Sequence, residues 1–256
     1  MTENISNSQL EMLLRCEFQY AERYGRGIKK PPRSAMSFGS AFHEGTLFNL
    51  SRKIDSGKDL PTSEVVEVAI TGLEIRADET EWDDEPLSDC KDGMVGLIEV
   101  FQEESAPSIQ PAAVEEEVRV GFTGKDWQLL MYRDVREVDN TTHDLKTAGR
   151  SWPKGRELTK TQPIIYTIPD PGESKFVYDV AVRTKTPKTQ TITRIVTPEE
   201  KAGMLGLLAA AKAAGDQLKA DPDRALPTGY GGNLCSKKWC GYWEACNAKW
   251  KLPIKD

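Results

Sequence analysis

The chain has 256 residues, of which 38% are apolar and 29% are charged, and its formal net charge is -6. This length can form one well-packed core or at most two small ones. The longest apolar stretch, residues 204–211, is much shorter than the ~20 residues a membrane span needs, and no basic segment followed by an apolar one opens the chain. We therefore expect a cytoplasmic protein, with neither a secretory signal nor a membrane partner.

Helical spacing of apolar residues dominates the first hundred residues. Ser8 and Glu11 fit a capping box ahead of the first amphipathic pattern. The second helix carries Gly39 and His43 one turn apart. A weaker helical periodicity continues through the acidic residues 55–110. The predicted helices cover residues 8–23, 37–50, 62–78 and 91–104.

Alternating, β-branched sequence begins near residue 114. A hairpin turn at Thr123–Asp126 joins the first two strands, and Thr197-Pro198 is a typical helix start. The predicted strands cover residues 114–122, 127–138, 141–147, 175–183 and 189–196, and the later helices 158–168 and 197–220. This order predicts an α/β (α+β) protein of one domain, with a central mixed sheet flanked by helices. Its expected parts are residues 1–54 (N-terminal helices), 55–110 (acidic helical insertion), 111–220 (catalytic α/β core) and 221–256 (cysteine tail).

The net charge hides a strong asymmetry. Residues 74–117 carry 15 acids, Asp83 and Asp84 among them, and two bases, so the rest of the chain is net positive. Clustered lysine and arginine are typical of a phosphate-binding face. The basic clusters are Arg23, Arg26, Lys29, Lys30 and Arg33; Lys146, Arg150, Lys154, Arg156 and Lys160; and Lys237, Lys238, Lys249 and Lys251.

Two carboxylates and a lysine form the most informative pattern. Asp134 lies near the middle of one predicted strand, and Asp144 and Lys146 lie two residues apart on the next, so they project from one face. Paired carboxylates suit Mg²⁺ or Mn²⁺, and a lysine beside them can position a water. A metal-activated water next to a cation meets the needs of phosphodiester hydrolysis. Taken alone, Asp-x-Lys is also common in surface ion pairs.

Together with flanking motifs, this pattern resembles the RecB-type branch of the PD-(D/E)xK nuclease superfamily. The flanking motifs are SNSQL at 6–10, RCEFQY at 15–20, SFGSAFH at 37–43, QPIIY at 162–166 and LCSKKWCGYWEAC at 234–246. The chain looks most like small phage-encoded exonucleases, and is similar to CRISPR-adaptation-associated and AddB-like nucleases. The resemblance implies a restriction-endonuclease-like core and, if the protein is phage-encoded, the host cytoplasm as its location.

The resemblance also implies a role for each matching residue. His43, Asp134, Asp144 and the backbone carbonyl of Leu145 would hold two Mg²⁺ or Mn²⁺ ions. Lys146 would orient or activate the attacking water, and Gln162 and Tyr166 would position the DNA and the site. Glu116 or Glu117, on the preceding strand, is a further candidate carboxylate.

Four of the five cysteines are expected to share a site. Three lie within twelve residues near the end of the chain, a spacing typical of metal ligands in a cytoplasmic protein. Spacing alone leaves zinc and an iron–sulfur cluster open. The resemblance implies a structural [4Fe–4S] cluster that ties the N-terminal helix to the tail. Its ligands would be Cys16, Cys235, Cys240 and Cys246, whereas Cys90 receives no role.

The leading hypothesis is therefore a Mg- or Mn-dependent DNA exonuclease that acts 5′→3′ on single-stranded or end-accessible DNA in replication, recombination or processing. The chain lacks nucleotide-binding motifs, so a helicase or recombination protein would act in trans. Three alternatives remain open: a flap or structure-specific endonuclease, a catalytically silent DNA-binding recombination partner, and a zinc-stabilised interaction module.

Overall fold

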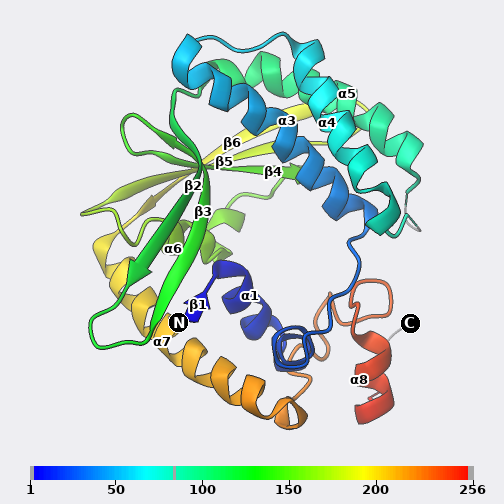
Figure 1. Ribbon diagram of the computed structural model, residues 1–256, viewed down its shortest axis with the longest axis vertical. Coiled ribbons are helices and arrows are strands. Elements are labelled where there is room, and N and C mark those ends of the chain that lie inside the picture. Colours follow the sequence, from blue (N-terminus) through cyan, green and yellow to red (C-terminus); the bar gives the residue numbers. More distant parts are fainter. Residues whose placement is uncertain (1–2, 83–84, 253–256) are drawn as a thin grey trace. The chain divides into compact units, whose positions relative to one another are not determined.

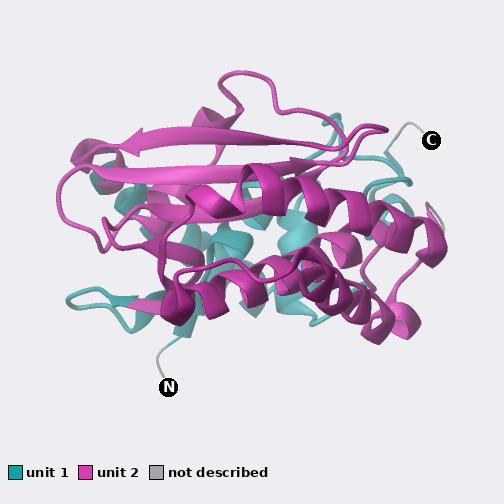
Figure 2. Ribbon diagram, turned by 90° about the horizontal axis from the view of Figure 1, so that it is seen from above, with its two compact units in different colours: residues 1–30, 120–130, 202–256 teal, residues 31–119, 131–201 magenta. Residues whose placement is uncertain are grey.

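The computed structural model describes residues 3–82 and 85–252, so Asp83 and Asp84 of the acidic segment lie outside the described residues. The chain forms two compact units, coloured separately in Figure 2. Unit 1 comprises residues 1–30, 120–130 and 202–256, and unit 2 comprises residues 31–119 and 131–201. None of the described helices is long and apolar enough to cross a membrane.

A mixed β-sheet runs through unit 2 (Figure 1). Strand β3 is antiparallel to β4, β4 is parallel to β5, and β5 is antiparallel to β6; β2 pairs with β3. The strands are β2 (Pro111–Gly121), β3 (Trp127–Glu137), β4 (Thr142–Ala148), β5 (Ser174–Val182) and β6 (Lys188–Val196). The prediction of a central mixed sheet is confirmed.

Three helices lie beside the sheet of unit 2; two of them contact its strands, and the third packs against the other two. They are α3 (Ser34–Ser56), α4 (Thr62–Ile75) and α5 (Leu87–Glu104), and Figure 1 shows them together on one side of β4–β6. Phe42 of α3 meets Phe101 of α5 edge to face, with ring centroids 5.4 Å apart. Leu145 of β4 belongs to the same buried cluster. Gly45 permits close helix contact, because a Cβ there would lie 2.8 Å from the Val65 carbonyl.

Shorter elements complete unit 2. A second apolar cluster gathers Trp152, Phe176 and Tyr178 on the sheet. The short helices are η2 (Ala77–Glu79), η3 (Ala106–Ser108), η4 (Arg156–Thr159) and α6 (Gln162–Tyr166), and the first residues of α7 (Pro198–Ala220) also belong to this unit.

Unit 1 is mainly helical. Its short strand β1 (Glu3–Ile5) pairs in parallel with residues 127–129 of β3. The remaining elements are α1 (Asn7–Arg15), α2 (Glu17–Tyr20), the π-helix η1 (Ala21–Gly25), the rest of α7, η5 (Pro222–Arg224) and α8 (Trp243–Trp250).

Several predicted boundaries were wrong. The predicted helix 8–23 breaks at Cys16, whose extended backbone ends α1 and precedes α2. The capping box of α1 is formed by Ser6 and Gln9 rather than by Ser8 and Glu11. The predicted helix 158–168 is two short helices, η4 and α6, because proline lacks the N–H that a continuous helix needs at position 163.

Candidate active site

Three elements of unit 2 bring the first site residues together. Leu145 of β4 donates its backbone N–H to Asp134 Oδ2 on β3 at 2.8 Å. The Nε2 of His43, on α3, lies 2.5 Å from the Leu145 carbonyl oxygen, and its Nδ1 lies 3.6 Å from Asp134 Oδ2. Gly39 allows α3 to approach β4, because a Cβ there would lie only 3.3 Å from Thr147 Oγ1. The glycine thus brings the helix close to β4, and His43, one turn later, reaches the Leu145 carbonyl.

Asp144 is the most deeply buried ionisable residue of the site. Its side chain is 2% exposed and forms an ion pair with Lys146, whose side chain is one-third exposed. The pair lies two residues apart on β4, as the alternation of strand side chains requires. Gln162, the first residue of α6, donates its amide N–H to Asp144 Oδ1 at 2.5 Å. The carboxylate is thus held from two sides by a cation and an amide.

Asp134 and Asp144 are carboxylates placed away from water, where negative charge is unfavourable. Desolvation, followed by the negative charge of Asp144, raises the pKa of Asp134 to about 6. The charges of His43 and Lys146 and the N–H of Leu145 act in the opposite direction. Two adjacent carboxylates away from water are stabilised by added positive charge, so the site favours a cation.

An open cavity of about 450 Å³ adjoins these residues within unit 2. His43 and Asp134 line it together with Arg76, Glu115 and Tyr132. Glu115 has a left-handed backbone, with a φ of 51° in the middle of β2, a conformation uncommon for a residue other than glycine. The predicted extra acids face other partners: Glu116 binds Arg136, and Glu117 binds Arg119 and Tyr132. Of these three acids, it is Glu115 that lines the cavity.

Tyr166 ends α6. Its ring packs edge-on to Phe176, with centroids 6.3 Å apart, and its carbonyl oxygen accepts two hydrogen bonds from Arg133. Direct contacts therefore join the predicted site residues in two sets, residues 43, 134 and 145 and residues 144 and 146, which follow one another along β4. Gln162 contacts the second set through Asp144, whereas Tyr166 is joined to it through α6.

A comparison of the sequence with protein families decides the classification. The profile of the PD-(D/E)XK nuclease superfamily matches residues 4–247, nearly the whole chain. The chain belongs to the PD-(D/E)XK nuclease superfamily. A search of curated proteins found no match. Among solved structures, the nuclease resembles a crystal structure titled "Putative exonuclease" from Eubacterium rectale, with 12% identity, a TM-score of 0.57 and coverage of 95% of this chain and 88% of that chain. At this identity the likeness concerns the fold.

The nuclease's donor atoms suit a hard divalent cation, although they are not arranged around one. Two carboxylates, an imidazole and a carbonyl oxygen are typical ligands of Mg²⁺ and Mn²⁺. Within residues 3–82 and 85–252, no three His, Cys, Asp or Glu side chains converge closely enough to hold a metal ion. The atoms concerned contact one another instead: His43 contacts the Leu145 carbonyl, and Asp144 contacts Lys146 and Gln162.

The nuclease also contains a buried triad that sequence reasoning missed. The two nitrogens of His143 lie 2.6 Å from Asp179 Oδ2 and 3.1 Å from Glu137 Oε2. Burial acts to lower the pKa of His143, but these two carboxylates outweigh it and raise the pKa above its ordinary value. Because His143 precedes Asp144 on β4, the triad anchors this strand to its neighbours β3 and β5.

Four cysteines of unit 1 line a single cavity of about 200 Å³. Cys16 and Cys246 are buried, and Cys235 and Cys240 are partly buried. Burial, followed by the neighbouring thiols, raises the pKa of Cys246 to about 11. Gln19 donates to the sulfur of Cys240 at 3.2 Å. Cys16 therefore lines the same cavity as the three C-terminal cysteines, although no three of these described thiols lie close enough together to hold a metal ion. Cys90 lies apart in unit 2, buried beside Glu85.

Proposed function

We propose that this nuclease is a metal-dependent DNA exonuclease that leaves 5′-phosphate and 3′-hydroxyl ends, acting 5′→3′ on single-stranded or end-accessible DNA. The observation that carries the proposal is that His43 lies beside Asp134, and Lys146 beside Asp144, on adjacent elements of one unit in a chain that belongs to a nuclease superfamily. The similar structure titled "Putative exonuclease" supports the choice of exonuclease over endonuclease.

His43, Asp134, Asp144 and the Leu145 carbonyl would hold two Mg²⁺ or Mn²⁺ ions. Such ions polarise the phosphoryl oxygen and make a bound water more acidic. The raised pKa of Asp134 supports this assignment, because a cation would relieve the repulsion between the two acids.

Lys146 is the residue that we assign to the attacking water. Its ammonium is partly exposed and is fixed by Asp144, so it can hold a water or a phosphate oxygen while it remains charged. Gln162 would keep the Asp144 carboxylate in one orientation through its amide. Tyr166, on the same short helix, would help to position DNA.

We further propose a structural [4Fe–4S] cluster bound by Cys16, Cys235, Cys240 and Cys246, with zinc as the alternative. Four thiols around one cavity support either metal centre. Bound there, the group would stabilise unit 1, since Cys16 and the three other ligands are more than 200 residues apart in the sequence.

We propose that both units form one nuclease domain, because the superfamily match includes residues of each. The protein would act in the cytoplasm on DNA during replication, recombination or processing. A helicase or recombination protein in trans would supply strand separation.

The decisive experiment compares cleavage of linear and covalently closed circular DNA by anaerobically purified protein with Mn²⁺ or Mg²⁺. We expect digestion of linear DNA only, with a loss of about 10²–10⁴-fold in Lys146→Ala. Lys175→Ala, which removes an exposed lysine from β5, is the matched control and should retain full activity. End-labelled substrates give the direction of digestion.

Each alternative predicts another outcome. Cleavage of the circle indicates an endonuclease, and DNA binding without cleavage indicates a silent binding protein. A colourless zinc protein that does not bind DNA indicates an interaction module. A brown protein with absorption near roughly 400 nm supports the iron–sulfur assignment, and a colourless protein that contains one zinc refutes it.

A further inference from the structure

Arg133 is a buried arginine with no part in the proposed reaction. It directly precedes Asp134 on β3 and is 3% exposed. Removing a guanidinium from water costs free energy unless its N–H groups have hydrogen-bond partners. The contacts of Arg133 therefore identify the groups that this strand positions. All the residues of this network belong to unit 2.

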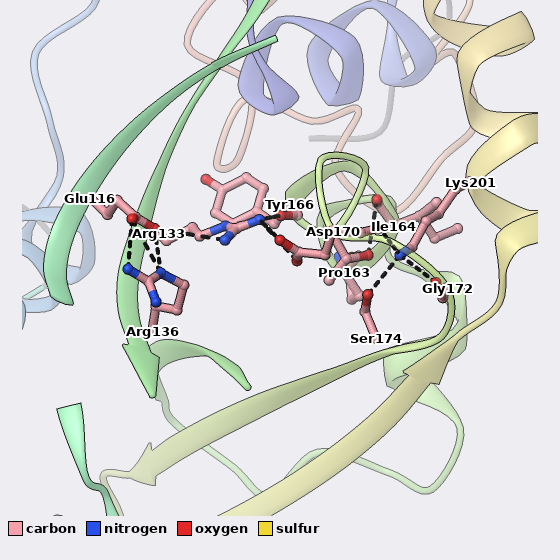
Figure 3. A network of polar contacts seen from close by, with 11 residues as sticks. Glu116, Arg133, Arg136, Pro163, Ile164, Tyr166, Asp170, Gly172, Ser174 and Lys201 are labelled. Carbon is pink, nitrogen blue, oxygen red and sulfur yellow. Dashed lines mark hydrogen bonds and ion pairs between the residues drawn. The ribbon is translucent and has the colours of Figure 1, made fainter. Parts of the chain in front are cut away.

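The guanidinium of Arg133 binds two groups outside β3, the Tyr166 carbonyl and the Asp170 carboxylate (Figure 3), and we call this pair of contacts the Arg133 fork. Its Nε and Nη2 donate to the Tyr166 carbonyl oxygen at 3.1 and 2.7 Å. Nη2 also lies 2.9 and 3.0 Å from the two carboxylate oxygens of Asp170. On its other side, Nη1 lies 3.7 Å from Glu116 Oε2, while Arg136 holds Glu116 more closely, at 3.0–3.1 Å.

The contact with Tyr166 is important because α6 is too short to be stable by itself. A helix of five residues has almost no stability of its own, and its final carbonyls lack partners within the helix. Arg133 supplies two donors to the last of them. Thr167 closes the same end by donating its hydroxyl to the Pro163 carbonyl at 2.8 Å.

The segment after α6 is held just as firmly. Lys201 donates to the backbone oxygens of Asp170 and Gly172, both at 2.9 Å, and to Ser174 Oγ at 2.6 Å. Figure 3 shows these contacts as a continuation of the Arg133 fork. Asp170 thus has its carboxylate held by β3 and its backbone by α7, which makes it a fixed anchor for the guanidinium.

The opposite, N-terminal end of α6 contacts Asp144. Gln162 begins the helix and donates to Asp144 Oδ1 at 2.5 Å, and Asp134, next to Arg133, accepts the N–H of Leu145. The Arg133 fork therefore fixes the distance between β3, which carries Asp134, and α6, whose Gln162 orients Asp144.

We propose that Arg133 is a positioning residue of the nuclease: it holds α6 so that Gln162 keeps the Asp144 carboxylate oriented for the divalent cation. The inference rests on the proposed function. It predicts that loss of the fork weakens binding of the cation and slows cleavage while DNA affinity is preserved. Groups that orient metal ligands typically contribute about 10–100-fold to metal affinity or activity.

The test compares Arg133→Ala and Arg133→Lys with Arg136→Ala as the matched control. Arg136 lies on the same strand and pairs with Glu116, but it has no hydrogen bond or ion pair to Tyr166 or Asp170 among those described. We expect both Arg133 variants to bind Mn²⁺ at least about tenfold more weakly by electron paramagnetic resonance titration. DNA binding without divalent metal should be unchanged, and Arg136→Ala should keep the wild-type affinities for Mn²⁺ and for DNA. The lysine variant keeps the positive charge but cannot donate to both Tyr166 and Asp170 as the guanidinium does. It replaces the alanine variant in the test if the alanine variant fails to fold.

Two further measurements separate positioning from general stability. Guanidinium ion at millimolar concentration should restore part of the Mn²⁺ affinity and cleavage to Arg133→Ala and none to Gln162→Ala. The double variant should be no worse than Gln162→Ala alone, because residues that act through one another are not additive. Additive losses, an absence of rescue, or unchanged Mn²⁺ affinity in a folded Arg133→Ala overturns the proposal. Absence of cleavage in the wild-type protein, by contrast, overturns the proposed function and leaves the Mn²⁺ result to be judged by itself.

Discussion

Replacing Lys201 with methionine should destabilise unit 2 through one buried ammonium. Lys201 is 7% exposed, and its three donors are used by Asp170, Gly172 and Ser174 at 2.6–2.9 Å. Methionine fills most of the same volume and donates nothing. Three acceptors then lose their partner while the packing stays nearly intact.

The magnitude follows from these contacts. A hydrogen bond to a charged group contributes about 1.5–3 kcal/mol, but an ammonium also loses hydration when it is buried. Gly172 is exposed, so water can replace one of the three bonds. We expect a net loss of about 2–4 kcal/mol and, for a chain of this size, a fall in melting temperature of about 2–4 °C per kcal/mol.

The pH dependence gives a second signature. Burial lowers the pKa of Lys201, and Asp170 opposes that effect only in part. Between the folded-state pKa and the ordinary value near 10.4, the unfolded chain binds more protons than the folded one, so the free energy of unfolding rises with pH. Lys201→Met should lack this rise.

Urea unfolding followed by tryptophan fluorescence and circular dichroism measures both effects. The exposed Lys188 on β6 supplies the control Lys188→Met, which should change stability by no more than about 0.5 kcal/mol. A Lys201→Met protein as stable as that control, with the wild-type pH profile, would refute the reasoning.

Three further predictions follow from other parts of the molecule. Gly45→Ala should lower stability by about 1–3 kcal/mol in urea unfolding, because its methyl group would meet Val65 and Ala69 at under 3 Å; an unchanged midpoint would contradict the α3–α4 contact. Cys246→Ser should lose bound iron and melt earlier, while Cys90→Ser should keep its iron by colorimetric assay; equal iron contents would exclude the four-cysteine site. Removing divalent metal with a chelator should stop cleavage, and Mn²⁺ or Mg²⁺ should restore it; cleavage that persists without divalent metal would refute the metal role.

Local patterns predicted the elements that hold the candidate site residues. Alternation predicted β3 and β4, and spacing by two placed Asp144 and Lys146 on one face of a strand. Helical spacing placed Gly39 and His43 one turn apart on one helix, and the structure adds that the glycine lies against Thr147. These features depend on neighbours in the sequence, which is why they could be predicted.

The parts that escaped prediction depend on distant partners. Arg133 precedes Asp134 on the strand, so the two side chains point to opposite faces, and only the tertiary structure brings Arg133 to Asp170. The break at Cys16 has a similar cause, since the backbone N–H of Phe18 donates to the Leu226 carbonyl at 3.0 Å. Glu115 requires a left-handed backbone in a strand, which no local pattern indicates.

The parallel pairing of β4 with β5 has a consequence for the order of assembly during synthesis. A growing chain that has reached Tyr166 already contains every residue of the proposed metal and water sites. The strand that aligns with β4 from Thr142 to Ala148 begins only at Ser174, and parallel strands joined by a long connection pair slowly. An incomplete chain therefore carries the proposed catalytic residues without the strand that aligns with β4, so nuclease activity would arise only after β5 has been made.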